Sequence, residues 1–495
     1  MICVSIARSR LRHVLAEHKH LVAQGATLVE LRLDYITGEI QLRKLLEGRP
    51  SPVIATCRRE ADGGKFVGSE EQRLQILRTA IAEGVDYIDL EEDTAGLIPR
   101  FGKTKRIVSH HDFEKTPDNL EELHARLASQ DADIVKLATM ANTPRDNVRM
   151  LRLVQSSDIP TVGICMGEIG TPSRILAGKY GAPFTFATFH HERTLAPGQL
   201  SFQEMTEVYH YDEINPDTAV YAVIADPVGH SMSPLIHNSA LHFQGINAVY
   251  LPFRVPRQNL VEFLSDAPHL EIRGLSVTIP HKEAVIPSLS KIDRAVREIG
   301  AANTIVLGEE GLVGYNTDAR AVLDSLAQEM NRSIGDDDFL RDKNALILGA
   351  GGVARAVAYA LKRCGAHVEV TGRTAERAEE LARRFDCKTV EWSARHGVGC
   401  DILVNCTPVG MHPNVDDTPY AKHHLKPSMV VFDTVYNPET TLLAKEARSQ
   451  GCDVVSGLDM FVRQAALQYK LFTRQNAPTD LMREVLRKAI GAARM

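Results

Sequence analysis

Short β-rich runs alternate eight times with helix-length amphipathic stretches over the first 210 residues of this 495-residue chain. Alternating strands and helices predict a parallel sheet, and eight repeats in little more than 200 residues indicate a small (β/α)8 barrel. The competing architecture is an open, doubly wound sheet of eight strands. Two of the predicted helices are Glu70–Glu83 and Asn119–Ser129. The predicted strands are Cys3–Ala7, Leu28–Asp34, Pro52–Arg58, Tyr87–Glu91, Arg106–Asp112, Asp133–Thr139, Pro160–Gly167 and Phe184–Phe189.

A second series of strands follows the polar, proline-containing stretch Tyr211–Thr218, which we interpret as a linker. The last 35 residues are predicted to be helical. At roughly 150 residues per domain, the whole length corresponds to about three domains. The predicted strands of this half are Tyr221–Asp226, Ala248–Arg254, Leu275–Ile279, Thr304–Leu307, Leu312–Tyr315, Asn344–Gly349, His367–Thr371, Asp401–Cys406, Met429–Thr434 and Asp453–Val455.

The overall charge and hydropathy exclude several classes of function. A net charge of −6 gives no basic footprint for nucleic acid and argues against binding to an anionic membrane surface. No apolar run approaches the roughly 20 residues that are needed to span a bilayer. Met1–Ala7 enters a strand-like run without the features of a secretory signal, so we expect a cytoplasmic chain.

The cysteines and histidines give no indication of a metal site. The eight cysteines are scattered without a Cys-x-x-Cys pair, which favours reduced thiols over disulfides or a zinc ribbon. Adjacent histidines such as His110–His111 could suggest metal ligands, but side chains at successive positions diverge. No triad of ligands has the spacing of a metal site, and we expect no bound metal.

A glycine-rich string follows the predicted strand Asn344–Gly349 and precedes a predicted helix. Glycines in this context let the chain turn tightly and let backbone N–H groups approach a pyrophosphate at the helix N-terminus. The string therefore predicts a dinucleotide site, the alternative being a glycine-rich turn without a ligand. Its residues are Gly349, Ala350, Gly351, Gly352, Val353 and Ala354.

The end of the next strand indicates which dinucleotide binds. An NAD site usually carries an acid there, which accepts a hydrogen bond from the ribose 2′-hydroxyl. Here Thr371 is followed by Gly372, Arg373 and Thr374, with Arg377 a few residues later. Guanidinium groups suit a 2′-phosphate, so NADP is favoured over NAD. In the alternative interpretation, both arginines are solvated residues at the start of a helix.

Three polar clusters lie upstream of the dinucleotide string. Ser231 and Ser233 follow the first strand of this half, and Lys282 follows another strand-like run. Asn303 and Asp318 add an amide and a carboxylate at further strand ends. Each cluster alone is more often a turn or a helix cap. Together, beside a dinucleotide fold, they indicate polar groups that converge on a polyhydroxylated substrate.

Together with three further segments, these strings resemble shikimate dehydrogenase over residues 218–490. The further segments are Asn405–Met411, Asp433–Asn437 and Gly457–Gln468. The resemblance implies NADP as cofactor, Lys282 and Asp318 as the catalytic pair, and Thr374, Thr407 and Gly457 at the cofactor. An ammonium held by a carboxylate can protonate the alkoxide that forms when a ketone accepts hydride. One departure is Gly372, where the family commonly has Asn. The implied ligands of shikimate are Ser231, Ser233, Thr278, Asn303, Tyr436 and Gln464.

The first half contains a lysine within an apolar strand, Lys136 in Asp133–Thr139. Such a lysine must lie near the strand end or face a polar cavity. One interpretation is a side chain that extends from the strand tip into solvent. The other is a Schiff-base lysine, whose amine is kept partly neutral by burial or by a neighbouring cation.

Other strands of the first half also end in polar groups, as expected of an active site at the C-terminal ends of barrel strands. Such groups suit a substrate that carries a carboxylate and a carbonyl. The loop segments Met166–Arg174 and Ala196–Gln199 add an arginine and an amide near the last two strands. The strand-end segments are Glu30–Asp34, Thr56–Arg58, Asp89–Glu91 and Ser109–Phe113.

These motifs resemble type I 3-dehydroquinate dehydratase over about residues 1–210. The resemblance implies that Lys136 forms an imine with the ketone, that His111 is the general acid and base, and that Glu91 orients His111. The iminium acidifies the adjacent C–H bond, and the same histidine then protonates the departing hydroxyl. The family usually has Ser before Ala-Pro-Gly-Gln, where this chain has Leu195. The implied substrate contacts are Glu30, Arg32, Arg58, Arg174 as the carboxylate clamp, and Gln199 in the lid.

The two resemblances predict a bifunctional enzyme that dehydrates 3-dehydroquinate to 3-dehydroshikimate and reduces this product to shikimate with NADPH. The predicted domains are the barrel at 1–212, a substrate domain at 218–325 completed by helices in 458–495, and a Rossmann NADP domain at 326–457. We expect small-molecule partners, with no nucleic acid and no membrane, and a homodimer is considered. The alternatives are a quinate or dual quinate/shikimate dehydrogenase in the second half, and a metabolite sensor without turnover.

Overall fold

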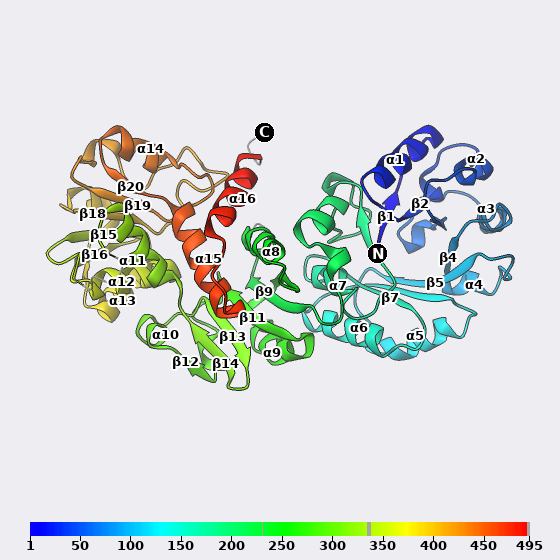
Figure 1. Cartoon of the computed structure of the whole chain (residues 1–495), viewed down its shortest axis with the longest axis horizontal. Coiled ribbons are helices and arrows are strands. Elements are labelled where there is room, and N and C mark those ends of the chain that lie inside the picture. Colours follow the sequence, from blue (N-terminus) through cyan, green and yellow to red (C-terminus); the bar gives the residue numbers. More distant parts are fainter. Residues whose placement is uncertain (230, 334–337, 493–495) are drawn as a thin grey trace. The chain divides into compact units, whose positions relative to one another are not determined.

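The computed structural model describes residues 1–229, 231–333 and 338–492. The chain divides into two compact units, the first built chiefly from Met1–Val220 and the second chiefly from Ile272–Met495 (Figure 1). No helix among the described residues is long and apolar enough to cross a membrane. The predicted domain ranges include residues 334–337 and 493–495, which lie outside the described residues. The exact domain limits therefore stay predictions.

The first unit contains the predicted barrel. Its parallel strands follow the order β7-β6-β5-β4-β3-β2-β1-β8, so that β1 pairs with both β2 and β8 and the sheet curls into a nearly closed barrel. This order confirms the (β/α)8 prediction and excludes the open, doubly wound sheet. The strands are β1 (Ile2–Ile6), β2 (Leu28–Arg32), β3 (Val53–Thr56), β4 (Tyr87–Glu91), β5 (Lys105–Asp112), β6 (Ile134–Met140), β7 (Thr161–Met166) and β8 (Thr185–Thr188).

Helices follow seven of these strands, and α3 (Glu70–Ala82) among them begins at a capping box that the sequence contains. The helix predicted over Glu70–Glu83 begins after Ser69, whose hydroxyl accepts from the Gln72 N–H while the Gln72 side chain accepts from the Ser69 N–H. A π-helical turn, Glu204–Val208, stands where an eighth helix would follow β8. The helices are α1 (Leu11–Ala23), α2 (Leu42–Leu46), α3 (Glu70–Ala82), α4 (Glu92–Ala95), α5 (Leu120–Ala128), α6 (Arg145–Ser156) and α7 (Thr171–Leu176).

The interior of the barrel is apolar at one end and holds a partly polar cavity at the other. Side chains two residues apart share a face of a strand, so Ile134, Lys136 and Ala138 of β6 all face inward. Ile134 belongs to an apolar layer at the start of the strands, whereas Lys136 and Ala138 line a cavity further along. The apolar layer consists of Cys3, Leu28, Ile54, Ile107, Ile134, Val162, Ile164, Phe184 and Phe186.

The second sheet has six strands in the order β10-β9-β11-β13-β14-β12. The strand predicted over Leu275–Ile279 lies at Ile272–Val277, because the chain turns before Pro280, which has no N–H for a ladder. The two-residue strand β12 was not predicted. The strands are β9 (Ala219–Ala225), β10 (Ala248–Arg254), β11 (Ile272–Val277), β12 (Lys291–Ile292), β13 (Thr304–Gly308) and β14 (Gly311–Tyr315), and the helices are α8 (Ser233–Phe243), α9 (Leu260–Asp266), α10 (Arg294–Ile299) and α11 (Asp318–Glu329).

The third sheet is parallel, with the order β17-β16-β15-β18-β19-β20. The order reverses between β15 and β18, which is where a doubly wound fold binds its dinucleotide. This confirms the Rossmann prediction, although the short β17 was missed. The strands are β15 (Asn344–Leu348), β16 (His367–Thr371), β17 (Lys388–Thr389), β18 (Ile402–Asn405), β19 (Val430–Asp433) and β20 (Asp453–Val455), and the helices are α12 (Gly352–Arg363), α13 (Ala375–Phe385), α14 (Leu442–Ser449), α15 (Gly457–Thr473) and α16 (Thr479–Ala492).

Candidate active sites

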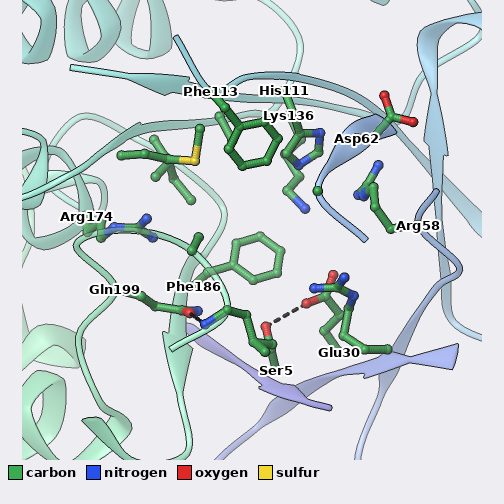
Figure 2. A pocket seen from close by; sticks show the side chains of 17 residues that line it. Ser5, Glu30, Arg58, Asp62, His111, Phe113, Lys136, Arg174, Phe186 and Gln199 are labelled. Atoms are coloured by element: carbon green, nitrogen blue, oxygen red, sulfur yellow. Dashed lines mark hydrogen bonds between the residues drawn. The ribbon is translucent and has the colours of Figure 1, made fainter. Parts of the chain in front are cut away.

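A pocket lies at the C-terminal ends of the barrel strands. Figure 2 shows Lys136 and His111 pointing into it, with Arg58 and Arg174 on opposite sides. The pocket brings together seven of the eight barrel residues predicted from the sequence: Glu30, Arg32, Arg58, His111, Lys136, Arg174 and Gln199. Its lining also includes residues that were not predicted, among them Ser5, Asp62, Phe113 and Phe186.

Lys136 is enclosed by the barrel, with 6% of its surface exposed. Its Nζ lies 2.9 Å from Asp89 Oδ2 and 4.3 Å from the centroid of the Phe186 ring. A side chain that extends into solvent is therefore excluded. A buried ammonium requires a counter-ion, and Asp89 provides it.

Asp89 is a buried carboxylate that pairs with two residues of the pocket lining, Arg58 and Lys136, although the sequence interpretation did not select it. Its Oδ1 accepts hydrogen bonds from Arg58 Nη2 at 2.7 Å and from Ser109 Oγ at 2.6 Å. Burial alone would raise the pKa of this carboxyl, but the charges of Arg58 and Lys136 hold the pKa well below its usual range. Asp89 is therefore a permanent anion beside the lysine.

Glu91 lies between two guanidinium groups on the same strand as Asp89. Its Oε1 accepts from Arg58 Nη1 at 2.8 Å and its Oε2 from Arg73 Nη1 at 2.7 Å. Asp89, not Glu91, is the carboxylate whose charge raises the pKa of His111. Both acids belong to β4, and the role of Glu91 in orienting His111 stays a prediction.

The His111 imidazole is kept neutral by its surroundings. Desolvation lowers its pKa well below the ordinary value, and the cations Arg58 and Lys136 lower it further. The ring stacks on Phe113 with 6.3 Å between centroids. A neutral imidazole next to a lysine can accept a proton from a substrate carbon.

The first two strands provide anchored polar groups. Glu30 accepts from Ser5 Oγ at 2.6 Å and from Thr56 Oγ1 at 2.8 Å, so that both carboxylate oxygens are held by hydroxyls. Arg32 donates two hydrogen bonds, of 2.9 and 2.8 Å, to Asp34. Each side chain is fixed by contacts that leave it in the pocket lining.

Arg174 is a buried cation with incomplete partners. It is 1% exposed, and its Nη2 donates to Pro197 O at 3.3 Å, while its Nε is buried without a hydrogen-bond partner. Burial lowers its pKa to about 10. The lid loop lies nearby: Gln199 Oε1 accepts from the Leu195 N–H at 2.9 Å. An arginine in this state fits an anionic ligand such as a carboxylate.

A second cluster joins Lys282, Asn303 and Asp318 in the second unit. Lys282 Nζ lies 2.6 Å from Asp318 Oδ2, and Asn303 Nδ2 donates to Asp318 Oδ1 at 2.9 Å. Lys282 lies in the turn after β11, and Asp318 begins α11. The carboxylate therefore holds the ammonium on one side and is itself fixed on the other.

The remaining predicted ligands of the substrate are distributed over neighbouring elements. Ser231 precedes α8 and its Oγ accepts from the Ser233 N–H at 3.3 Å, while Thr278 directly follows β11. Tyr436 stacks on Phe461 at 4.4 Å, and Gln464 Nε2 donates to the carbonyl oxygen of Phe461 at 3.0 Å. Their convergence on the Lys282–Asp318 pair stays a prediction.

The glycine-rich turn has the geometry of a dinucleotide loop. Gly349 has φ +109°, and a Cβ at this position would lie 2.9 Å from the Cys406 carbonyl oxygen, so the turn after β15 packs closely on the one after β18. Gly351 caps α12, whose N-terminal N–H groups are available to a pyrophosphate. Thr407 is held by Asn405 Oδ1 through its N–H at 3.0 Å and its hydroxyl at 2.7 Å.

The groups expected at a 2′-phosphate lie at the end of β16. Arg373, Thr374 and Arg377 are exposed, and among the described residues no ion pair involves either arginine. A Cβ at Gly372 would lie 3.9 Å from Ala350, an ordinary contact beside the glycine-rich turn. Two unpaired guanidiniums next to this turn fit a dinucleotide phosphate. Gly457 has a separate structural role, because a Cβ there would lie 2.3 Å from the Val435 carbonyl oxygen.

Comparison with known families assigns both halves of the chain. The model of type I 3-dehydroquinase matches residues 2–216. The model of the shikimate dehydrogenase substrate binding domain matches 223–305, that of shikimate/quinate 5-dehydrogenase matches 329–408, and that of the shikimate 5'-dehydrogenase C-terminal domain matches 457–487.

Individual relatives cover the same ranges. The chain is 37% identical, over 99% of its length and 84% of the relative's, to a chloroplastic bifunctional 3-dehydroquinate dehydratase/shikimate dehydrogenase of Arabidopsis thaliana. A shikimate dehydrogenase (NADP+) of Moorella thermoacetica is 41% identical over 57% of this chain and 97% of its own. A shikimate dehydrogenase solved with NADP+ superposes with a TM-score of 0.52 at 36% identity, over 56% of this chain and 97% of its own. The chain belongs to the family of bifunctional 3-dehydroquinate dehydratase/shikimate dehydrogenases.

Proposed function

We propose that the barrel dehydrates 3-dehydroquinate to 3-dehydroshikimate through an imine on Lys136, and that the second unit reduces this product to shikimate with NADPH. The observation that carries the first activity is one pocket lined by Lys136, His111 and Arg174. Lys136 is paired with the buried Asp89, the pKa of His111 is lowered, and the Nε of Arg174 is buried without a partner. The Lys282–Asp318 pair, in the same unit as a dinucleotide loop, supports the second.

The dehydration requires one nucleophile and one proton carrier. Lys136, after losing a proton, adds to the ketone and water leaves, which gives an iminium. His111 removes a proton from the adjacent carbon, and the C–H electron pair moves into the iminium to form an enamine. The protonated His111 then gives its proton to the departing hydroxyl, water leaves, and hydrolysis returns the lysine and the conjugated ketone. Arg174 holds the substrate carboxylate during these steps.

The reduction requires a proton donor where the hydride arrives. NADPH supplies that hydride when bound at the glycine-rich turn. Lys282 donates a proton to the carbonyl oxygen as it becomes an alkoxide, and Asp318 keeps the ammonium directed at this oxygen. Asn303 fixes Asp318 from the other side.

The assay that tests the first activity follows the conjugated enone, whose absorbance the saturated substrate lacks. We expect this absorbance to increase when 3-dehydroquinate is added to the full chain without nucleotide. No increase would exclude the dehydratase. The same preparation, given NADP+ and either shikimate or quinate, decides between the two dehydrogenase specificities by the ratio of their kcat/KM values.

The His111 environment predicts an unusual pH dependence of dehydration. In the complex the imine has already formed, so kcat reports His111 rather than the ionisation of free Lys136. Because the histidine must be neutral to accept a proton, and its pKa is lowered, kcat should hold as the pH falls through about 6.5 and decrease only below that value. The measurement is kcat against pH, with the NMR titration of the His111 ring as a direct check. A decrease centred at or above pH 6.5 would contradict the assignment.

The NADP preference is expected to depend on Arg373 and Arg377. The loss of one charge-assisted contact to phosphate costs about 1.5–3 kcal/mol, which corresponds to a decrease of roughly 10- to 150-fold in kcat/KM for NADPH. Arg373→Ala should show this decrease, whereas its kcat/KM for NADH should stay near that of the wild type. Equal losses with both nucleotides would show that Arg373 does not read the 2′-phosphate.

The compartment and the assembly also belong to the proposal. We propose a cytoplasmic location, in contrast with the relative from Arabidopsis, which is described as chloroplastic. Microscopy of the tagged full chain in its own cells tests the location. We also propose a homodimer, which light scattering of the purified chain would distinguish from a monomer.

A further inference from the structure

The turn that carries Lys282 is supported by the helix of the dinucleotide site. Lys282 lies in the turn segment between β11 and the 3-10 turn Ile286–Ser288, anchored by a 2.7 Å hydrogen bond from the Ala302 N–H to the Lys282 carbonyl oxygen. Backbone hydrogen bonds shape this turn, among them His281 N–H to the Thr278 carbonyl oxygen at 2.8 Å and Val285 N–H to the His281 carbonyl oxygen at 3.0 Å, but they do not fix its side chains. Contacts with its surroundings therefore determine where the ammonium lies.

Two of these contacts come from one face of α12. The stem of Lys282 packs on Gly352, where a Cβ would lie 3.2 Å from Lys282 Cδ. The next residue, Glu283, places Oε2 3.2 Å from Nη2 of Arg355. Positions three apart on a helix share a face, so Gly352 and Arg355 together form a support for the pair Lys282–Glu283.

Arg355 is a buried cation that contacts carboxylates from two other elements. Its side chain is 8% exposed, and the same Nη2 donates to Glu380 Oε1 of α13 at 2.8 Å. Its Nε is buried without a hydrogen-bond partner. A cation close to a helix N-terminus opposes the helix dipole, and the two carboxylates offset this cost. One guanidinium therefore joins α12, α13 and the lysine turn.

We propose that Arg355 is a positioning residue for hydride transfer, which acts through Glu283 to hold Lys282 against the helix that binds NADP. This inference rests on the proposed shikimate dehydrogenase activity. The same helix α12 would bind the dinucleotide at its N-terminus and supports Lys282 through Gly352 and Arg355. The position of the proton donor is therefore fixed relative to the bound cofactor. Arg355 itself touches neither substrate nor nucleotide in this role.

The expected signature is a loss in kcat rather than in substrate affinity. A displaced reacting group can slow a step by 10- to 100-fold, so Arg355→Ala should lower kcat for shikimate oxidation by roughly that factor, with KM for shikimate and for NADP+ changed by less than about threefold. The deuterium isotope effect with shikimate labelled at the reacting carbon should increase, because hydride transfer becomes slower than product release. Arg355→Lys should restore part of kcat.

Two surface carboxylates give a matched pair of variants. Glu283 and Glu380 are 55% and 60% exposed and share the same guanidinium nitrogen, but only Glu283 adjoins Lys282. Glu283→Gln should reproduce the loss in kcat, Glu380→Gln should not, and the Arg355→Ala, Glu283→Gln double variant should lose no more than the worse single variant. Thermal unfolding of each variant, compared with the wild type, is the control for folding of the second unit, and dehydration by the barrel is the control for the amount of enzyme.

Several results would overturn the inference. These are a Glu283→Gln variant with the kcat and isotope effect of the wild type, equal losses in the Glu283 and Glu380 variants, or a change confined to KM for NADP+. If Arg355→Ala does not fold, the two glutamate variants decide alone, because both residues are at the surface. The wild type is assayed first. If it fails to oxidise shikimate, the proposed dehydrogenase function is overturned, and no variant needs to be compared.

Discussion

Lys136→Ala should abolish dehydration of 3-dehydroquinate while leaving NADP-linked oxidation of shikimate nearly unchanged. Removing a covalent nucleophile typically costs a factor of about 10⁴ or more in kcat. Lys136 is the lysine that lines the pocket, with Asp89 2.9 Å from its Nζ. The dehydrogenase residues Lys282 and Asp318 belong to the other unit, so their chemistry should not depend on this amine. Both activities are measured on the same preparation, so that shikimate oxidation controls for the amount of enzyme, and thermal unfolding of the variant controls for folding of the barrel.

The covalent step can be observed directly by trapping. An iminium is reduced irreversibly by borohydride, so incubation with 3-dehydroquinate or 3-dehydroshikimate plus borohydride should leave an adduct on the peptide that contains Lys136. Lys282 should stay unlabelled, because reduction by NADPH requires no imine. Lys136→Ala should give no adduct. An adduct on another lysine, or dehydration by the variant at close to the wild-type rate, would contradict the imine mechanism.

Lys282 and Asp318 should act as one unit in hydride transfer. Proton donation by a positioned side chain typically contributes 10²- to 10⁴-fold, so Lys282→Ala and Asp318→Asn should each lower kcat for shikimate oxidation by about that factor. Because Asp318 acts by holding the ammonium 2.6 Å away, it has little left to hold in the absence of Lys282. The double variant should then lose little more than the worse single variant.

The control for this pair is the dehydratase activity, which should be the same in all three variants. Losses that multiply in the double variant would show that Lys282 and Asp318 work independently. A large increase in KM for shikimate with kcat unchanged would assign both residues to substrate binding instead.

The barrel and its lysine could be predicted because both depend on local patterns. Eight alternating runs specify the sheet, and a lysine two residues after Ile134 on the same strand must share the face of that isoleucine. The sequence did not show whether the Lys136 side chain extends from the strand tip into solvent. The answer depends on the counter-ion Asp89 of β4, which lies 47 residues before Lys136 in the chain, and on strand β5, which pairs with the lysine strand.

The sequence could not distinguish the roles of the two acids on β4, for a physical reason. Asp89 and Glu91 are two residues apart on β4 and both face inward, so the strand pattern cannot decide which carboxylate meets the lysine. Long-range arginines decide it: Arg73 of α3, which binds Glu91, is itself held by Glu70 and Thr94. Such contacts between distant elements have no signature in a local sequence motif. Asp62, after β3, also lines the pocket and was not selected from the sequence.

The Rossmann half was predicted more completely, because its chemistry lies in adjacent residues. The turn from Gly349 to Gly352 follows a strand and opens a helix, and the absence of an acid after β16 is visible in the sequence itself. The support of Lys282 by α12 could not be read in this way. It joins segments about 70 residues apart in the chain through Gly352 and Arg355.

The most direct test of the two-site enzyme is to add 3-dehydroquinate and NADPH to the full chain and to measure the consumption of NADPH. No 3-dehydroshikimate is supplied in this mixture. We predict that wild type consumes NADPH after a lag in which 3-dehydroshikimate accumulates. Lys136→Ala should consume it only when 3-dehydroshikimate is supplied, and Lys282→Ala should form the enone without consuming NADPH. Mixing the two variants should restore NADPH consumption from 3-dehydroquinate. No NADPH consumption by the wild type from 3-dehydroquinate, or consumption by Lys136→Ala at the wild-type rate, would contradict the assignment of one reaction to each site.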